Sequence, residues 1–257
     1  MFNQKLLRIT ATIVLALSNF SICASNASSK LVQGFLQESE VTDGVNLLPS
    51  PPVDDSLLFI YNKTQYEKNR VLHNTSRGKQ AVLDAKIYEP DFGIEQVFSK
   101  AFGMELSKKH TPIIVGLLHQ IAIDSDKAIE RTKKHYMTVR PFVYYHDHTC
   151  YLHDEKELRK NGGYPSGHSA FGWAAALILS EINPERQNEI FKRGYEIGQS
   201  RVICGYHWQT DVEGGRLLAS AVIARLHGNQ RFLQQLQAAK NEFRRLRTKQ
   251  SVSLLNK

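Results

Sequence analysis

Apolar residues recur along most of this chain three and four positions apart, the spacing of a helix, and no segment alternates as a half-buried strand would. The clearest helix begins at Thr111-Pro112, where a capping residue precedes a proline at the first helical position. Beyond it, an apolar stripe consists of Ile113, Ile114, Leu117, Leu118, Ile121 and Ile129. This stripe predicts a long helix with one buried face.

The same periodicity predicts further helices. Their ranges are 54–75, capped by Asp55 or Ser56; 92–103, capped by Asp91; 185–203, introduced by Asn183-Pro184; and 211–228 and 229–247, separated by Gly228 and Asn229. The apolar run over 168–177 is rich in small residues and predicts a buried helix. The segment 78–88 is too short to assign, and three prolines make 45–56 extended or irregular. We therefore expect an all-α fold, a single-domain compact helical bundle.

The first residues have the three-part layout of a secretory signal peptide. Two basic residues precede an apolar stretch that is too short to cross a bilayer, and small residues follow it. We expect cleavage after Ala24 or Ala27, so that residues 1–24, or 1–27, are the signal peptide and 25–257 form one domain. The alternative, a buried N-terminal helix, would need a polar cap that this segment lacks. The residues before Cys23 fit a lipoprotein signal poorly, so we expect an exported protein with no stable membrane anchor.

Charge and cysteine content narrow the range of partners. The formal charge is +8, and it falls to +6 without the signal peptide, which holds two basic and no acidic residues. This modest excess favours anionic small molecules, while the scattered basic residues do not indicate a nucleic-acid surface.

In an exported protein, Cys150 and Cys204 predict a disulfide, and two free buried thiols are the alternative. Closing a loop of about 55 residues in this way would stabilise the fold by ~4 kcal/mol.

One long segment, 144–163, is polar, lacks helical periodicity and ends in Gly162-Gly163. Such a segment in a compact domain is more often functional than idle. It holds three histidines and two aspartates whose spacing matches no standard zinc site: His146, His148, His153, Asp147 and Asp154. We expect these groups to face the substrate rather than a metal, and we expect no cofactor.

Three short motifs place polar residues within otherwise apolar, helical surroundings. Their cations are Lys133, Arg140 and Arg201, and the first two stand seven positions apart, which would put them on nearly one face of a helix. Any one of them alone would more often be a surface residue with a packed stem. Three cations that converge on a buried site require an anion, and the arginine fork matches phosphate oxygens. Ser166 and Gly167 would add backbone N–H groups at the positive end of a helix.

The histidines of these motifs add reactive groups. His207 and Asp211 stand four positions apart, which on a helix brings them onto one face. The carboxylate can then accept the Nδ1 proton and leave Nε2 free as a nucleophile or a base. His168 supplies a second imidazole, so that one ring could attack while the other donates a proton to the leaving group. A lone histidine is more often structural, but this combination favours chemistry.

Together the motifs resemble the signature of the phosphatidic-acid-phosphatase type 2 / vanadium haloperoxidase superfamily. That signature is a lysine, six residues and Arg-Pro; later Pro-Ser-Gly-His; and later Ser-Arg, five residues, His, three residues and Asp. The segments 133–141, 165–168 and 200–211 fit every position. Longer stretches, such as NGGYPSGH and EINPERQNEIFKRGYEIGQSRVICGYHWQTD, resemble bacterial class A nonspecific acid phosphatases.

The resemblance implies an all-helical, metal-independent, periplasmic phosphomonoesterase. It further implies small-molecule phosphate esters as substrates, phosphotransferase side activity, inhibition by inorganic phosphate and vanadate, and a homo-oligomer. The positions that match phosphate-binding residues are Lys133, Arg140, Ser166, Gly167, Ser200 and Arg201. His207 would match the nucleophile that forms a phosphohistidine, Asp211 its partner, and His168 the acid for the leaving group.

Two other functions are compatible with part of this pattern. A vanadate-dependent haloperoxidase shares the anion site and uses a histidine equivalent to His207 as a metal ligand. The short chain and the stretches that resemble class A acid phosphatases argue against this function. A non-enzymatic anion-binding protein would need the cations but would have no use for both His168 and the pair of His207 and Asp211. We do not expect a membrane lipid phosphatase, because no later apolar stretch is long enough to span a bilayer.

Overall fold

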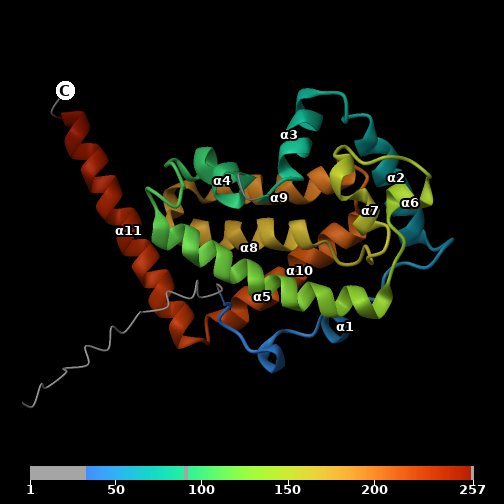
Figure 1. The fold of residues 1–257 in the computed structure, drawn as a ribbon, viewed down its shortest axis with the longest axis horizontal. Helices are drawn as coiled ribbons and strands as arrows, with labels where there is room; N and C mark the ends of the chain where they lie inside the picture. Colours follow the sequence, from blue (N-terminus) through green and yellow to red (C-terminus); the bar gives the residue numbers. More distant parts are fainter. Residues whose placement is uncertain (1–32, 90–91, 256–257) are drawn as a thin grey trace, which may run out of the picture. The chain divides into compact units, whose positions relative to one another are not determined.

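A computed structural model describes residues 33–89 and 92–255 of the 257-residue chain. The expected signal peptide with its cleavage site, and the expected cap Asp91, lie outside the described residues. Within them, nearly all of the regular secondary structure is helical (Figure 1), apart from one two-stranded sheet, which confirms the all-α class.

The elements follow one another along the chain as short and long helices. The α-helices are α1 (Gly44–Leu47), α2 (Leu57–Arg70), α3 (Ser76–Asp84), α4 (Ile94–Phe102), α5 (Pro112–Tyr136), α6 (Pro141–Tyr144), α7 (Glu155–Leu158), α8 (Gly167–Ile182), α9 (Gln187–Ile203), α10 (Gln209–Leu226) and α11 (Gln230–Leu255). Short 3₁₀ turns are η1 (Glu38–Glu40), η2 (Leu152–Asp154) and η3 (Pro184–Arg186). Two strands, β1 (Tyr88–Glu89) and β2 (Phe92–Gly93), pair antiparallel, with Tyr88 opposite Gly93 and Glu89 opposite Phe92.

The apolar helix α8 runs through the middle of the bundle. It packs against α5, α9 and α10, and Figure 1 shows α5, α8 and α9 side by side. Its small residues bring the neighbouring backbones close: Ala174, Ala175 and Ala176 are fully buried. At the contact with α9, a Cβ on Gly194 would lie 2.5 Å from that of Ala176. The sequence run of small residues therefore sets how near α9 can approach.

The long helix α5 begins at Pro112 as expected, but Thr111 does not cap it with its side chain. Thr111 Oγ1 instead accepts a hydrogen bond from the Ser107 N–H at 3.0 Å. The free N–H groups of Ile113 and Ile114 donate to the Glu242 carboxylate, at 3.3 and 2.9 Å. The cap thus comes from α11, more than a hundred residues away in sequence, because a buried carboxylate satisfies two unpaired donors and the helix dipole together.

Other expectations for the helices have mixed outcomes. Ser56 caps α2 by accepting from the Phe59 N–H at 3.2 Å, so of the two candidates Ser56 is the cap. The predicted stripe on α5 is buried, with Ile114, Leu117, Leu118 and Ile121 fully enclosed. The segment 78–88, left unassigned from sequence, contains most of α3 and the start of β1.

The polar segment 144–163 is irregular apart from the end of α6, η2 and the single turn of α7. A disulfide between Cys150 and Cys204 joins it to the end of α9, with the two Cα atoms 4.8 Å apart. The predicted bridge is therefore confirmed. In the described part of the chain, we find no helix whose length and hydropathy would suit it to cross a membrane.

Candidate functional site

A cavity of about 490 Å³ lies where α5, α8 and α9 meet the irregular segment. It is lined by Tyr88, Asp126, Ile129, Glu130, Lys133, Arg140, His153, Asp154, Glu157, Leu158, Gly167, His168, Arg201 and His207. Residues from all three sequence motifs therefore meet in one place, although they are up to 74 positions apart along the chain. Of the positions expected to bind phosphate, Lys133, Arg140, Gly167 and Arg201 line this cavity.

Lys133 and Arg140 converge by a different route from the one expected. They were predicted to share one helix face, but α5 ends at Tyr136 and Met137 adopts a left-handed conformation with φ 45°. Arg140 comes after this turn, in extended backbone just before α6. The helix predicted through both residues is therefore wrong, because the chain reverses between them. The turn, and not the seven-residue spacing, brings the two cations to the cavity.

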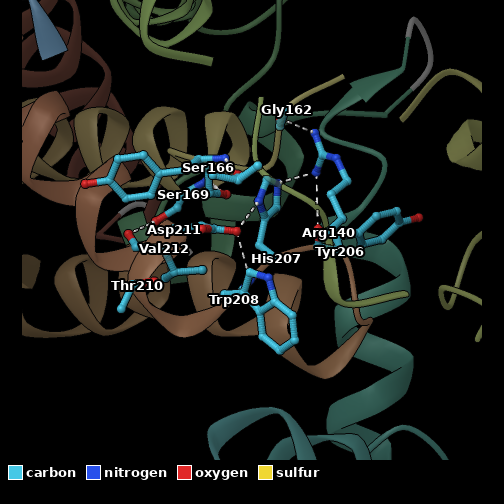
Figure 2. Close-up of polar contacts among 12 residues, drawn as sticks. Arg140, Gly162, Ser166, Ser169, Tyr206, His207, Trp208, Thr210, Asp211 and Val212 are labelled. Atoms are coloured by element: carbon cyan, nitrogen blue, oxygen red, sulfur yellow. Dashed lines mark hydrogen bonds and ion pairs between the residues drawn. The ribbon is translucent and has the colours of Figure 1, made fainter. Parts of the chain in front are cut away.

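The Arg140 guanidinium is fixed by hydrogen bonds to neutral groups (Figure 2). Its Nε donates to the Asn161 carbonyl at 3.2 Å and its Nη2 to the Gly162 carbonyl at 3.0 Å. Its Nη1 is 3.2 Å from the Tyr206 carbonyl and 3.0 Å from Nε2 of His207. Among the described residues no carboxylate forms an ion pair with Arg140, so its charge is held in place without being neutralised.

His207 lies between Arg140 and Asp211, as Figure 2 shows. Its Nδ1 is 3.3 Å from Oδ2 of Asp211, and the same oxygen accepts from the Trp208 N–H at 2.9 Å. The contact predicted from the four-residue spacing is present. The helical reason given for it is not, because His207 precedes α10 and only Asp211 lies in the first turn.

These contacts select one tautomer of His207. Arg140 can only donate, so the Nε2 atom that it contacts must accept and carries the lone pair. The ring proton is then on Nδ1, where it points to the Asp211 carboxylate. This is the arrangement that a nucleophilic or basic Nε2 requires.

The buried Arg201 side chain gives the strongest indication that the cavity binds an anion. Its side chain is 1% exposed, yet its Nε and Nη1 atoms have no hydrogen-bond partner in the described structure. The guanidinium stacks on the Tyr206 ring with its central carbon 3.7 Å from the ring centroid. A buried guanidinium with free donors is costly unless something accepts from them. Because Arg201 lines the cavity, an oxyanion bound there would lie beside a guanidinium that has no ion-pair partner in the described structure.

Lys133 is likewise buried, at 7% exposure, and no hydrogen bond or ion pair joins its ammonium to another described residue. Burial, and then the nearby Arg140, lowers the pKa of Lys133 to about 8. Burial also lowers the pKa of Arg140 to about 10 and that of Arg201 below its ordinary value. The three depressed pKa values have one cause, which is positive charge held out of water without a counter-ion.

The first turn of α8 adds donors to this positive site. Ser166 caps the helix by accepting from the Ser169 N–H, and its own N–H donates to the Asp211 carbonyl at 2.9 Å. Ser166 is fully buried and does not line the cavity, whereas Gly167 does. The space around Gly167 is open, since a Cβ there would meet nothing nearer than 3.8 Å. The N-terminus of α8 is therefore accessible to an anion in the cavity.

His168 forms its hydrogen bond with a backbone carbonyl. Its Nε2 donates to the carbonyl of Ala85 at 3.1 Å, and the edge of its ring packs on Tyr88 with the ring centroids 4.8 Å apart. Burial, and then Arg201, lowers the pKa of His168 well below its ordinary value, while the Ala85 carbonyl raises it. Burial and Arg140 lower the pKa of His207 in the same direction, and burial raises that of Asp211 to about 7.

Ser200 does not reach the cavity. Its hydroxyl donates to the Asp84 carboxylate at 2.5 Å and accepts from Arg77 at 2.9 Å. The position matches the signature, but the side chain points to a buried cluster behind the site. The helix α9 therefore directs the two neighbours differently, Arg201 toward the cavity and Ser200 away from it.

The irregular segment faces the cavity only in part: His146, Asp147 and His148 do not line it, contrary to expectation. His153 is 3.0 Å from Asp154, and both line the cavity, as expected for a segment that faces substrate. His148 pairs with Glu155 at 3.2 Å. Among the described residues, no group of three or more histidine, cysteine, aspartate or glutamate side chains is arranged to hold a metal ion.

Sequence reasoning missed three polar residues of the cavity lining. Tyr88, Asp126 and Glu130 line the cavity, and the Tyr88 hydroxyl donates to Asp126 at 3.2 Å. The spacing of Asp126, Glu130 and Lys133 on one face of α5 was a usable signal. Tyr88 offered none, because it lies in a segment that periodicity did not assign.

Comparisons with known proteins agree with this geometry. The model of the PAP2 superfamily matches residues 111–233. A non-specific acid phosphatase of Providencia stuartii is 50% identical over 214 residues, 83% of this chain and 86% of the relative. One from Salmonella typhimurium is 40% identical over 86% of this chain and 88% of the relative, and an acid phosphatase of Zymomonas mobilis is 33% identical over 80% and 78%.

The chain belongs to the PAP2 superfamily. Within it, the similarity to the non-specific acid phosphatases extends over most of the described residues and includes the whole cavity lining from Tyr88 to His207.

Proposed function

We propose that this protein is an acid phosphatase that hydrolyses small-molecule phosphate monoesters through a phosphohistidine at His207. The observation that carries the proposal is the buried Arg201, which has unpartnered donors and lines the same cavity as Lys133, Arg140 and His207. A phosphate dianion suits three buried cations that form no ion pair in the described structure, and the adjacent imidazole lone pair suits attack on its phosphorus. The names of the similar proteins are consistent with this activity.

The first chemical step forms one bond and breaks another. Nε2 of His207 attacks phosphorus, and the bond from phosphorus to the ester oxygen breaks as the leaving alkoxide departs. The leaving oxygen takes a proton from His168. Because the Nε2 proton of His168 is held by the Ala85 carbonyl, the transferable proton is the one on Nδ1. Asp211 accepts a hydrogen bond from the Nδ1–H of His207 and stabilises the cation that forms on this ring.

The second step reverses these roles. Water gives a proton to Nδ1 of His168 and attacks the phosphohistidine, the bond from phosphorus to nitrogen breaks, and phosphate leaves with His207 neutral again. An alcohol in place of water would give phosphotransferase side activity. Charge on the equatorial oxygens is met by Lys133, Arg140, Arg201 and the N–H groups that open α8, a preorganised electrostatic contribution that usually dominates such reactions.

Detection of the phosphohistidine intermediate tests this mechanism. Rapid quench with labelled substrate, followed by peptide mapping under alkaline conditions, should find label on His207 and none in His207→Ala. Label on the enzyme should pass to an added alcohol. Inversion of configuration at a chiral phosphorus centre would contradict the proposal, because it would indicate a single displacement by water.

Further proposals concern inhibitors, location and assembly. Vanadate, which adopts the geometry of the transition state, and inorganic phosphate should inhibit, and EDTA should leave the rate unchanged because the chain's own cations neutralise the phosphate.

Export is proposed from the N-terminal layout, so protein recovered from the periplasm of the native host should begin within Ser25–Ser28, and an intact Met1 would contradict it. A homo-oligomer should appear in sedimentation analysis, and a monomer at micromolar concentration would contradict that proposal.

A further inference from the structure

The carboxylate of Asp84 is fully buried behind the cavity and has an unusual number of partners. Asp84 is the last residue of α3. Both of its oxygens contact the Arg193 guanidinium, and Oδ2 also accepts from the Ser200 hydroxyl at 2.5 Å. Oδ1 further accepts from the Gln80 amide at 3.1 Å. A buried carboxylate with four hydrogen bonds to three side chains is held in one position.

These partners fasten the end of α3 to α9. Arg193 and Ser200 stand seven residues apart on α9, which is about two helical turns, so both face the same neighbour. Arg77, in the first turn of α3, donates to the Ser200 hydroxyl at 2.9 Å and to the Glu196 carbonyl at 2.8 Å. The helix α3 is therefore pinned to α9 near its start by Arg77 and at its end by Asp84.

The residue after Asp84 contacts the reacting groups. The Ala85 carbonyl accepts the hydrogen bond from Nε2 of His168, at 3.1 Å. Ala85 is itself buried, and its N–H donates back to the Ala81 carbonyl at 3.1 Å. Only the backbone of one residue separates the Asp84 clamp from the carbonyl that fixes the proton of His168.

We propose that Asp84 is a positioning residue for the general acid: by clamping the end of α3 to Arg193 and Ser200, it holds the Ala85 carbonyl against His168 and keeps the transferable proton on Nδ1. This proposal rests on the proposed function, in which His168 protonates the leaving group. Asp84 does not line the cavity, and its positioning effect reaches the reaction through Ala85 and His168. Its charge also raises the pKa of Arg201, an effect on anion binding that alkyl and aryl phosphates share.

The clamp matters because the surroundings of His168 oppose its protonation. The titratable and charged side chains that share its cavity are Tyr88, Asp126, Glu130, Lys133, Arg140, His153, Asp154, Glu157, Arg201 and His207. Burial and Arg201 lower the pKa of His168 most, and the Ala85 carbonyl acts in the opposite direction. If the carbonyl moves away, the imidazolium loses a hydrogen bond, and the pKa of His168 falls further.

Substitution of Asp84 by asparagine tests this role through the leaving group. We compare kcat/KM for alkyl phosphates, whose leaving alkoxide needs a proton, with that for aryl phosphates that carry good leaving groups. In Asp84→Asn the alkyl substrates should lose at least tenfold more than the aryl substrates. The basic limb of the pH profile of kcat/KM for alkyl phosphates should also move to lower pH. Equal losses for both substrate classes with an unmoved basic limb would overturn the proposal.

The control is Glu242→Gln, which weakens a second buried carboxylate contact, at the N-terminal end of α5 and away from the cavity lining. It should change neither the ratio of alkyl to aryl rates nor the pH profile. Should Asp84→Asn fail to fold, Arg193→Lys and Ser200→Ala each remove part of the clamp while leaving Asp84 in place. These variants should show smaller changes in the same ratio, and an unchanged ratio in both would overturn the proposal.

His168→Asn separates the two hypotheses. If it shows no selective loss on alkyl phosphates, the acid role of His168 in the proposed function is wrong, and the inference about Asp84 falls with it. If it shows that loss while Asp84→Asn does not, the proposed function stands and the positioning role is wrong.

Discussion

The guanidinium of Arg140 donates a hydrogen bond to Nε2 of His207 at 3.0 Å, so the nitrogen proposed as the nucleophile already has a cationic partner. The hydrogen bond keeps a proton off Nε2 and fixes the plane of the ring. In the proposed function, a phosphate that enters the cavity takes Arg140 as its own donor, which frees the lone pair when phosphorus is close. Arg140 thus has one role before substrate binds and another after.

Arg140→Lys should therefore lower kcat/KM by about 10²–10³, the usual effect of losing one preorganised donor. Lysine keeps the positive charge, but it cannot hold the Asn161, Gly162 and Tyr206 carbonyls and His207 with one planar group. Steady-state kinetics on an aryl phosphate measures this loss, and Lys134→Arg, on an exposed neighbour, is the control that should change little. A loss of less than threefold would show that charge alone suffices.

Anion binding should weaken as pH rises through the pKa of Lys133. The folded pKa is about 8, so the ammonium is charged below that pH and neutral above it. Sulfate, whose own charge is constant in this range, should bind about tenfold more weakly at pH 9 than at pH 7, since the site loses one proton. Isothermal titration calorimetry measures the affinity. In Lys133→Met the contribution of Lys133 to this slope should disappear, and an unchanged slope would assign the effect to another group.

The disulfide should contribute to global stability and not to chemistry. Cys150→Ser with Cys204→Ser should lower the free energy of unfolding by ~4 kcal/mol, because the bridge closes a long loop in the unfolded chain. Urea unfolding of the oxidised protein and the double variant measures the difference. Peptide mapping without reduction should recover the linked peptides, and two alkylatable thiols in the native protein would contradict the bridge.

Close packing of α8 on α9 predicts opposite effects for two glycine substitutions. Gly194→Ala should destabilise the fold by about 1–3 kcal/mol, because the new methyl group would lie 2.5 Å from the Cβ of Ala176. Gly116→Ala on α5 has nothing within 4 Å of its added carbon and should stabilise by about 0.5–1 kcal/mol, since glycine is a poor helix former. Thermal denaturation of both variants measures the pair. Destabilisation of equal size in the two would contradict this account of the helix contact.

The helices were predictable where local signals and burial agree. The stripe on α5, the Ser56 cap and the apolar α8 each have a periodic or capping pattern within a few residues. The cap of α5 was not predictable, because its acceptor comes from Glu242 on a distant helix. Its place beside α5 depends on tertiary packing that no window of sequence contains.

The functional site was likewise predictable from sequence only in part. The residue types and spacings were sufficient to collect Lys133, Arg140, Arg201, His168 and His207 into one cavity. They could not say how the chain turns, so the left-handed Met137 between the first two cations was missed. Nor could they give the direction of the Ser200 side chain, because adjacent residues on a helix point about 100° apart and only the packing of α9 decides which of them faces the cavity.

The unpartnered donors of Arg201 have a consequence for the lifetime of the protein. Without an anion, the folded state holds like charges close together in a poorly solvated interior, and part of its conformational stability is lost to that repulsion. An anion at a hundred times its dissociation constant would return about 2.7 kcal/mol by mass action, since it binds the native chain and not the unfolded one. In the proposed function, phosphate would be both the product of the reaction and the counter-charge of these buried cations. In the proposed function, scarcity of phosphate would favour turnover by removing a product inhibitor and would at the same time leave the protein more open to unfolding and proteolysis.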